Sequence, residues 1–368
     1  MHAEVADVFR RYGPSYRNAH KLPLNHLRTM HAIEICRTAS LGGHIDECEE
    51  CGHVKISYNS CRNRHCPKCQ FLKKEKWVEA RGRELLPIEY FHVVFTLPDE
   101  LNPLALRNRE VVYNILFRAA SETLTELADT RLGVRIGFIA VLHTWGQNLM
   151  DHPHLHCIVS GGGVSHGKWV SSKRRFLFPV KVMSRLFRGK FLDFLKKAYE
   201  RKEIQSGEEF TGFLRGLYAK EWVVYAKPPF NGPKTVVGYL GRYTHRIAIT
   251  NHRITSMEDG RVSFSWKDYS DGMRTKIMTL DAAEFIRRFL LHVLPHGFVK
   301  IRHFGFLSNR NRKTCLESCR RALGAAEPPT SAPETWQESL LRITGIDVTR
   351  CPICHGTMRS KQLYRGPP

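Results

Sequence analysis

Two pairs of closely spaced cysteines constrain the amino-terminal part of this chain more than any other feature. Cys48 and Cys51 form one CxxC motif, and Cys66 and Cys69 form another, within the segment "CEECGHVKISYNSCRNRHCPKC". Fourteen residues separate the two pairs. Each pair lets two thiolates reach one ion from a tight turn, and two such turns complete a tetrahedron. The spacing therefore predicts a structural zinc ion held by these four thiolates.

Other cysteines offer further zinc ligands. Cys61 is the strongest candidate to replace one of the four or to join a second site, in a region that also contains Cys36, His44, His53 and His65. Near the carboxy terminus, "CPIC" supplies Cys351 and Cys354, and "CLESC" places Cys315 and Cys319 on one helical face. These four could form a tetrahedral site in the tail. A CxxxC motif in a helix can equally be two small buried side chains.

The chain carries a strong excess of positive charge. Its 57 Lys and Arg against 35 Asp and Glu leave a formal net charge of +22, and basic runs include 310–313 and 319–321. This balance favours a polyanionic partner, most often nucleic acid, although a soluble protein can simply be basic. No apolar run approaches the ~20 residues that cross a bilayer, and the start lacks the layout of a signal peptide. We expect a cytoplasmic protein, nucleoid-associated when bound to DNA, with reduced cysteines and no membrane partner.

Hydrophobic periodicity predicts strands and helices without a regular β-α alternation. β-Branched and aromatic runs predict strands over 89–98, 134–145, 155–163 and 221–229, and a hairpin of 247–254 and 261–268 around a turn at 255–260. Helical spacing predicts helices over 22–40, 104–128, 180–220 and 233–246, and a capping-box pattern of Asp281 and Glu284 begins another. This mixture favours an α+β domain in which helices flank a central, mainly antiparallel sheet.

Three histidines alternate in "HPHLH", residues 152 to 156, where a strand is predicted to begin. Side chains at i and i+2 of a strand share a face, so His154 and His156 project together while Leu155 points to the other face. His152, before Pro153, falls at the frayed start of the strand. Two imidazoles on one face can bind a divalent cation and leave coordination positions open, as a catalytic metal requires. They can also be an ordinary hydrogen-bonded pair.

A pair of tyrosines lies downstream. "YLGRYTHR" places Tyr239 and Tyr243 four residues apart, and therefore on one face of the predicted helix. A tyrosine hydroxyl can attack a phosphodiester and keep a phosphotyrosyl bond, which splits strand transfer into two steps. Alternatively, both side chains belong to a core.

Taken together, these motifs resemble one known family. "HPHLH" followed by an apolar strand and "GGG", "YLGRYTHR" and "ITNHR" downstream, and "CRNRHCPKC" upstream are similar to the HUH-type two-tyrosine transposases of rolling-circle insertion sequences, the IS91 type. The order and spacing of several motifs make the resemblance specific. It implies an amino-terminal zinc-binding domain in residues 1–84, an HUH endonuclease domain in 85–300, and a basic tail in 301–368 that could hold a second zinc.

The resemblance also implies roles for single residues. His154 and His156 would hold Mg²⁺ or Mn²⁺ against the scissile phosphate, and Tyr239 and Tyr243 would be the nucleophiles that carry the 5′ phosphate. HUH sites usually recruit a third polar ligand, for which Gln147 is the preferred candidate, with His143, Asp151 and His245 as rivals. Three residues beside the tyrosines could contact DNA phosphates or lie on a solvated helix face: Arg242, His245 and Arg246.

The sequence thus predicts a transposase that cleaves single-stranded insertion-sequence ends and transfers the strand through a 5′-phosphotyrosine. No GxxxxGKS motif is present, so a host helicase would supply unwinding. A plasmid replication initiator or relaxase would use the same site. A zinc-containing nucleic-acid-binding protein would use these histidines and tyrosines only structurally, and a metal-dependent hydrolase would use the histidines to activate water.

Overall fold

Two compact units make up the chain. One comprises residues 1–76, 245–293 and 329–368, and the other comprises residues 77–244 and 294–328. Each unit is therefore assembled from segments that lie far apart in the sequence. The computed structural model describes residues 3–173, 175–207, 209–227, 230, 235–236, 238–239, 241, 247–269, 271–327 and 334–363.

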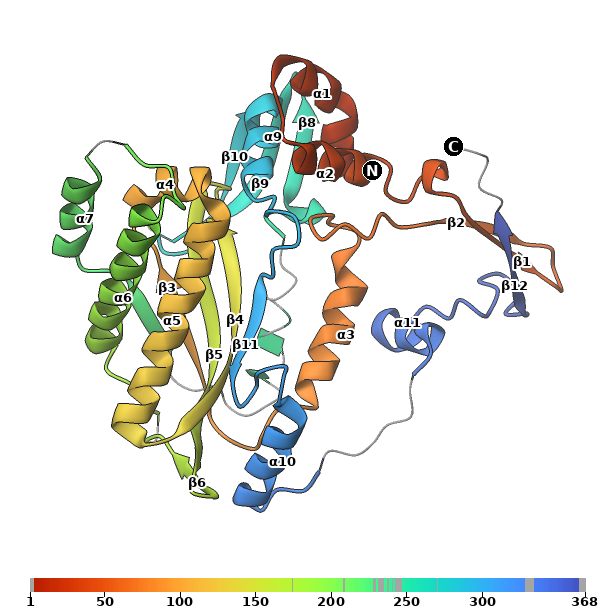
Figure 1. Cartoon of the computed structure of the whole chain (residues 1–368). Helices are drawn as coiled ribbons and strands as arrows, with labels where there is room; N and C mark the ends of the chain where they lie inside the picture. The colour runs from red at the N-terminus through yellow and green to blue at the C-terminus, as the bar shows by residue number, and fades with distance from the viewer. Residues whose placement is uncertain are drawn as a thin grey trace. The chain divides into compact units, whose positions relative to one another are not determined.

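An antiparallel sheet organises the unit of residues 77–244 and 294–328 (Figure 1). Its strands follow the order β11-β4-β5-β3-β7, and β6 pairs with β5 beside this path. The strands are β3 (Tyr90–Thr96), β4 (Arg135–Trp145), β5 (Asp151–Ser165), β6 (Lys168–Ser171), β7 (Val224–Lys227) and β11 (Ile301–Gly305). Only residues 146–150 separate β4 from β5, which makes these two long strands a hairpin.

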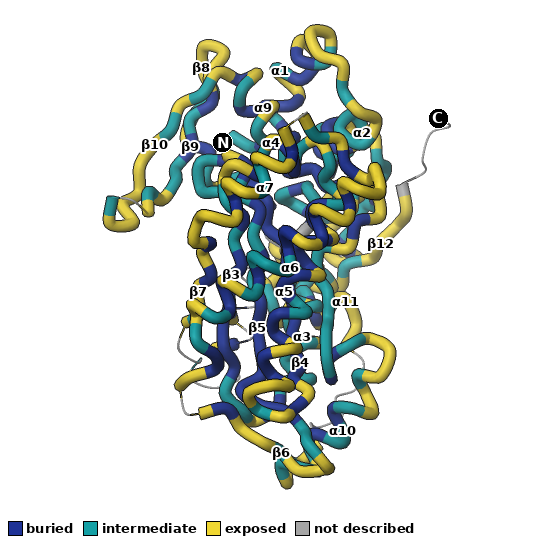
Figure 2. Tube along the Cα trace, turned by 60° about the vertical axis from the view of Figure 1, so that its left-hand side comes forward, coloured by how far each residue is buried: buried dark blue, intermediate teal, exposed yellow. Residues whose placement is uncertain are grey.

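Helices cover one face of this sheet. They are η2 (Asp99–Leu101), α4 (Asn102–Arg107), α5 (Arg109–Leu132), α6 (Val180–Glu200) and α7 (Phe210–Ala219). Leu155, Cys157 and Val159 alternate along β5 and share the main core with residues such as Phe117 of α5 and Phe187 of α6. Figure 2 shows how much of β4, β5 and α5 is buried. Removal of these apolar surfaces from water fixes which face of β5 points inward.

Smaller apolar clusters lie on the opposite face. One joins Ile139 and Val141 of β4 to Leu316 of α10 (Arg312–Leu323) and to Trp77, in the later part of α3 (Gln70–Gly82). The other contains Tyr90, Ile158, Val236 and Tyr239. Since Ile158 follows His156 by two positions on β5, these clusters share their face of the sheet with the histidines.

The second unit combines both ends of the chain with residues 245–293. Phe9 packs edge to face on Phe289, with ring centroids 5.2 Å apart, and Phe264 packs on Phe285. These contacts join α1 (Val5–Ala19), α9 (Ala282–Leu291) and the sheet of β8 (Ile254–Glu258), β9 (Arg261–Asp268) and β10 (Arg274–Asp281). The other helices among the described residues of this unit are α2 (Leu24–Glu34), η1 (Ala39–Leu41), η3 (Asn251–Arg253) and α11 (Trp336–Thr344).

A second three-stranded sheet in this unit pairs the two ends of the chain. Its central strand β1 (Gly43–Cys48) lies between β2 (Val54–Tyr58) and β12 (Met358–Leu363), both antiparallel to it. The pairing of β1 with β12 extends over the whole of both strands. The carboxy-terminal segment is thus built into the amino-terminal cysteine region.

The α+β class and the antiparallel sheets are confirmed, while several boundaries differ from the prediction. β5 begins at Asp151, ahead of the predicted 155, and the helical stretch 180–220 divides into α6 and α7. In the hairpin, residues 255–258 belong to β8 instead of the turn, and β10 was not predicted. Most of the predicted helix 233–246 lies outside the described residues, although 235–236, 238–239 and 241 are helical.

Two long-range features also differ from the sequence-based expectations. Residues 245–293, expected within the 85–300 domain, cluster with the amino-terminal segment, as do residues 329–368.

At the start of α9, Asp281 is the N-cap, as predicted, but Glu284 bonds Arg287 and Arg288 instead of completing a capping box. Among the described helices, none is long and apolar enough to cross a membrane.

Substitution of Leu155 tests which face of β5 forms the core. Leu155 lies between His154 and His156 in the sequence, and its side chain is fully buried. Leu155→Ala should therefore lower the free energy of unfolding by about 2–5 kcal/mol. Val223, just before β7, is 65% exposed, and Val223→Ala should change it by less than about 0.5 kcal/mol. Denaturant unfolding measures both. A Leu155→Ala variant as stable as the control would contradict the assigned register.

Candidate active site and metal centres

Strand pairing brings three histidines to one face of the sheet. His143 of β4 lies directly opposite His154 of β5, and His156 follows two positions later. Directly opposed residues of an antiparallel pair share a face, as do residues i and i+2 of one strand. All three imidazoles therefore project away from the core that contains Leu155.

The three imidazoles form a ligand set for a cation. One ring nitrogen from each of His143, His154 and His156 lies within 4.8 Å of the others, and Nε2 of His154 is 3.1 Å from Nε2 of His156. Nδ1 of His154 lies 2.6 Å from the carbonyl oxygen of His152. Since a carbonyl can only accept, this Nδ1 carries the proton, and Nε2 is the ring nitrogen whose lone pair can bind a cation. Three converging imidazoles fit a divalent transition-type cation.

A fourth histidine, His92 on β3, connects this group to a tyrosine. His92 pairs with Ile158, which puts its side chain on the same face. Its Nε2 is 2.9 Å from Nδ1 of His156, whose other ring nitrogen, Nε2, faces Nε2 of His154. Burial, together with the charges of Lys227 and His154, lowers the pKa of His92 to about 3, so the ring is neutral at physiological pH.

The hydroxyl of Tyr239 lies 2.8 Å from both Nδ1 and Nε2 of His92. The tyrosine is 7% exposed, and its ring packs on Phe230 with centroids 4.9 Å apart. Tyr239, His92 and His156 thus form a continuous line of polar contacts. His92 was not among the site residues predicted from the sequence, where its one signal is a polar residue inside the apolar strand 89–98.

The candidates for a third metal ligand lie at different places in the structure. His143, named as a rival, belongs to the histidine group. Gln147, the preferred candidate, is half-buried in the turn between β4 and β5, and its contact with the histidines stays untested. Asp151 is on the alternate positions of β5 that face the core, where burial raises its pKa to about 7. His152, at the start of the strand, lies near Asp99.

Several predicted site residues fall outside the described part of the chain. They are Arg242, Tyr243, His245 and Arg246. Their assignments as second nucleophile, third-ligand rival and DNA contacts therefore stay predictions.

The cysteines form two groups, which differ from the predicted one. Cys48 and Cys51 join Cys351 and Cys354, whereas Cys66 and Cys69 join Cys36 and Cys61. The two amino-terminal CxxC pairs, predicted to share one ion, therefore lie in different groups, and Cys61 lies with Cys66 and Cys69 in the second. The reason is the pairing of β1 with β12, which brings a partner CxxC from the other end of the chain.

Sulfur positions in both groups fit zinc. Sγ–Sγ distances are 3.4 Å for Cys48–Cys354 and 3.7 Å for Cys51–Cys351, and 3.5 Å for Cys61–Cys69 in the other group. A disulfide would need about 2.05 Å, whereas a tetrahedron with Zn–S bonds of about 2.3 Å has edges of about 3.8 Å. Four-thiolate sites leave no coordination position open, so the expected role is structural.

The other tail cysteines do not take part. Cys315 and Cys319 lie on α10 and pack with Leu316 in an apolar cluster. The proposed pairing of "CLESC" with "CPIC" is therefore wrong, and the alternative of small buried side chains describes these two residues.

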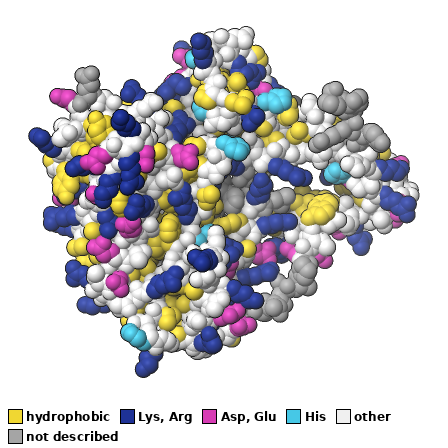
Figure 3. All heavy atoms as spheres, viewed as in Figure 1, with side chains coloured by type: hydrophobic (Ala, Val, Ile, Leu, Met, Phe, Trp, Pro, Cys, Tyr) yellow, Lys and Arg dark blue, Asp and Glu magenta, His cyan; other side chains and the backbone are white. Residues whose placement is uncertain are grey.

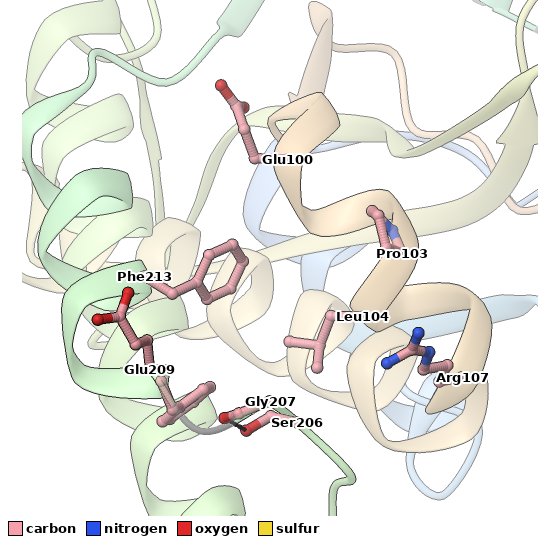
Figure 4. A pocket seen from close by; sticks show the side chains of 9 residues that line it. Glu100, Pro103, Leu104, Arg107, Ser206, Gly207, Glu209 and Phe213 are labelled. Atoms are coloured by element: carbon pink, nitrogen blue, oxygen red, sulfur yellow. Dashed lines mark hydrogen bonds between the residues drawn. The ribbon is translucent and has the colours of Figure 1, made fainter.

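A separate cavity of about 320 Å³ lies between α4 and the start of α7 (Figure 4). Leu104, Phe210 and Phe213 form its apolar lining, and Glu100 and Arg107 lie at its polar parts. It belongs to the helical layer, on the side of the sheet opposite the histidines. It is therefore not part of the histidine–tyrosine site.

Comparisons with known proteins identify relatives over the whole chain. A family described as "Putative transposase" matches residues 137–314, and a "Transposase zinc-binding domain" matches residues 8–97. The chain is 51% identical to "Putative transposase y4qJ" of Sinorhizobium fredii, over 99% of this chain and 96% of that protein. It is 30% identical to "Transposase for insertion sequence element IS801" of Pseudomonas savastanoi pv. phaseolicola, over 90% of this chain and 82% of that protein. No solved structure matches.

Zinc analysis of cysteine variants tests the pairing. Cys351→Ser removes one ligand of the group that contains Cys48, so the zinc content should fall from about two ions per chain to about one. Cys315→Ser, a matched change in α10, should leave it unchanged. Elemental analysis of the purified full-length protein measures both. A Cys351→Ser protein that keeps its full zinc content would contradict this pairing.

Proposed function

Since the chain belongs to the IS91 family of insertion-sequence transposases, we propose that it cleaves and rejoins single DNA strands through Tyr239 beside a divalent cation. The observation that carries this proposal is the contact of 2.8 Å between the Tyr239 hydroxyl and His92, which itself contacts His156. A nucleophile and a metal-ligand set on one face of a sheet suit an HUH endonuclease fold.

In the proposed reaction, the Tyr239 oxygen attacks the scissile phosphorus. A tyrosine–phosphate bond forms while the bond from phosphorus to the 3′ oxygen breaks. The tyrosine loses its phenolic proton and the 3′ oxygen takes up a proton, which yields a 3′ hydroxyl and a 5′-phosphotyrosine. The reverse attack by a 3′ hydroxyl joins the phosphate to a new strand and releases the tyrosine. Because the covalent bond conserves the energy of the phosphodiester, rejoining needs no ATP.

His143, His154 and His156 would hold Mg²⁺ or Mn²⁺. When bound, the cation would polarise the phosphoryl oxygens and stabilise the charge that develops on them. The protein's own contribution is orientation: the carbonyl of His152 and the ring of His92 fix the two β5 histidines so that their Nε2 atoms converge.

His92 would position the nucleophile. If Nε2 of His156 binds the cation, its Nδ1 carries the proton and donates to Nε2 of His92. Neutral His92 then carries its own proton on Nδ1, which can donate to the Tyr239 oxygen at 2.8 Å. Such a bond stabilises a tyrosine oxygen that gains negative charge, and it holds that oxygen toward the histidines.

We extend the proposal to a second tyrosine, the DNA contacts and the substrate. Tyr243 would be the second nucleophile, so that one tyrosine holds the donor end while the other attacks the next strand. Arg242, His245 and Arg246 would contact the DNA, together with the zinc-binding region. The substrates would be single-stranded insertion-sequence ends exposed during rolling-circle transposition, with a host helicase for unwinding. A replication initiator or relaxase would use the same chemistry, but the match to insertion-sequence transposases favours transposition.

Loss of the Tyr239 hydroxyl should abolish the covalent adduct. Incubation of the full-length protein with labelled single-stranded DNA and Mn²⁺ should yield a protein–DNA adduct, visible by denaturing electrophoresis. Tyr239→Phe should form none if Tyr239 attacks first, and Tyr225→Phe, an exposed tyrosine on β7, should match wild type. A wild type that binds DNA without adduct would favour a non-catalytic protein. Cleavage that survives Tyr239→Phe plus Tyr243→Phe would favour water as the nucleophile.

The identity of the third ligand is decided by two variants. His143→Ala should weaken the affinity for Mn²⁺ by at least about tenfold, since loss of even an outer-shell partner typically costs that much. Gln147→Ala should have a smaller effect. Calorimetric titration of Mn²⁺ into zinc-loaded protein measures both. If Gln147→Ala causes the larger loss, the ligand is Gln147, as the sequence suggested.

A further inference from the structure

A group of basic side chains collects on the histidine-bearing face of the sheet, at its β11 edge. Arg81 near the end of α3 and Arg312 at the start of α10 both contact Oε1 of Glu84, at 2.9 and 3.0 Å. NH1 of Arg81 also lies 3.5 Å from Nε2 of His303 on β11. Arg320 of α10 bonds the neighbouring carbonyl of Arg83. Three guanidinium groups thus surround a single described carboxylate.

These groups are partly withdrawn from water. The side chains of Arg81 and Glu84 are 14% and 19% exposed, and that of Arg312 is 25% exposed. Burial lowers the pKa of Arg81, and burial with the nearby Arg81 and Arg312 lowers the pKa of His303 to about 4. His303 is therefore neutral, and the excess positive charge resides on the arginines.

Two buried donors in this group lack a partner among the described residues. They are Nε of Arg81 and Nδ1 of His303. Because Nε2 of neutral His303 accepts from Arg81, its Nδ1 must carry the proton. Oε2 of Glu84 is also without a partner there. Unpaired buried donors beside excess positive charge are the features of a site that an anion completes.

The position of the group relates it to the candidate active site. His303 pairs with Ile139 of β4, and Ile139 lies four residues before His143 on the same face. At about 3.4 Å per residue, this is a separation of roughly 14 Å along the strand. A DNA strand whose scissile phosphate reaches the histidines could carry another of its phosphates to this point.

We propose that Arg81, Arg312, Arg320 and His303 form a pocket for a backbone phosphate of the single DNA strand that enters the active site. This inference rests on the proposed function and extends it, by adding a second point of contact on the substrate. The basic residues of 310–313 and 319–321 then fall into two sets, one at the pocket and one exposed to solvent. Arg312 and Arg320 turn toward the sheet, whereas Arg310, Lys313 and Arg321 are exposed. Figure 3 shows Lys and Arg dispersed over the visible face, so exposed charge alone does not mark a strand path.

Binding of a fluorescent oligothymidylate to full-length protein without divalent cation tests the pocket independently of cleavage. Each phosphate contact of a single strand adds about 0.7 to the slope of log affinity against log salt, so it contributes about fivefold at about 0.1 M salt. Arg312→Ala should weaken binding about fivefold and reduce that slope by about 0.7. Glu84→Gln, which removes a repulsive charge but keeps an acceptor, should strengthen binding. Arg321→Ala, on the exposed side of α10, should match wild type.

The opposite effects of Arg312→Ala and Glu84→Gln on DNA affinity distinguish a phosphate pocket from an internal ion-pair network. If both variants lower the unfolding temperature and bind with the affinity and slope of wild type, the pocket inference is overturned and the proposed function stands. A wild-type protein that does not bind the oligonucleotide would overturn both. Unfolding of each variant, followed in parallel, shows that a loss of affinity occurs in folded protein.

Discussion

The antiparallel register of β4 and β5 is the constraint on which the candidate active site depends. It sets His143 opposite His154 and leaves Leu155 for the core. A slip of one residue would turn every side chain of the strand to the other face. The buried apolar set Leu155, Cys157 and Val159 opposes that slip, because it would expose them to water. The same burial that stabilises the sheet therefore aligns the imidazoles.

Neighbouring strands extend this polar face in both directions. On one side, His92 of β3 connects His156 with Tyr239, which belongs to a segment that follows strand β7 in the chain. On the other side, His303 of β11 meets the arginines of α3 and α10. One face of the sheet thus carries the main apolar core, and the other carries the histidine group, Tyr239 and the arginines beside smaller apolar clusters. This division suits the proposed function, in which a charged DNA strand is held against a rigid support.

The cysteine groups show a different use of long-range contact. A short β-hairpin such as β1–β2, with its largely exposed second strand, cannot bury enough apolar surface to be stable alone. The strand β12 adds a third strand, and Cys351 and Cys354 add two thiolates opposite Cys48 and Cys51. Closure of so long a loop by a metal costs chain entropy that grows only slowly with length, so the tail can serve as well as a nearby segment.

The sequence by itself determined the local features: the α+β class, the strands of β3 and β4, the alternation of His154 and His156, and the CxxC motifs that can hold zinc. These follow from spacing along the chain, since the period of a strand and the reach of a tight turn are local properties. Only the tertiary structure decided which distant residues meet. The pairing of Cys48 with Cys354, the place of His92 beside Tyr239 and the inward turn of Arg312 depend on strand order and register, and these are set by the burial of the whole core and not by any single segment.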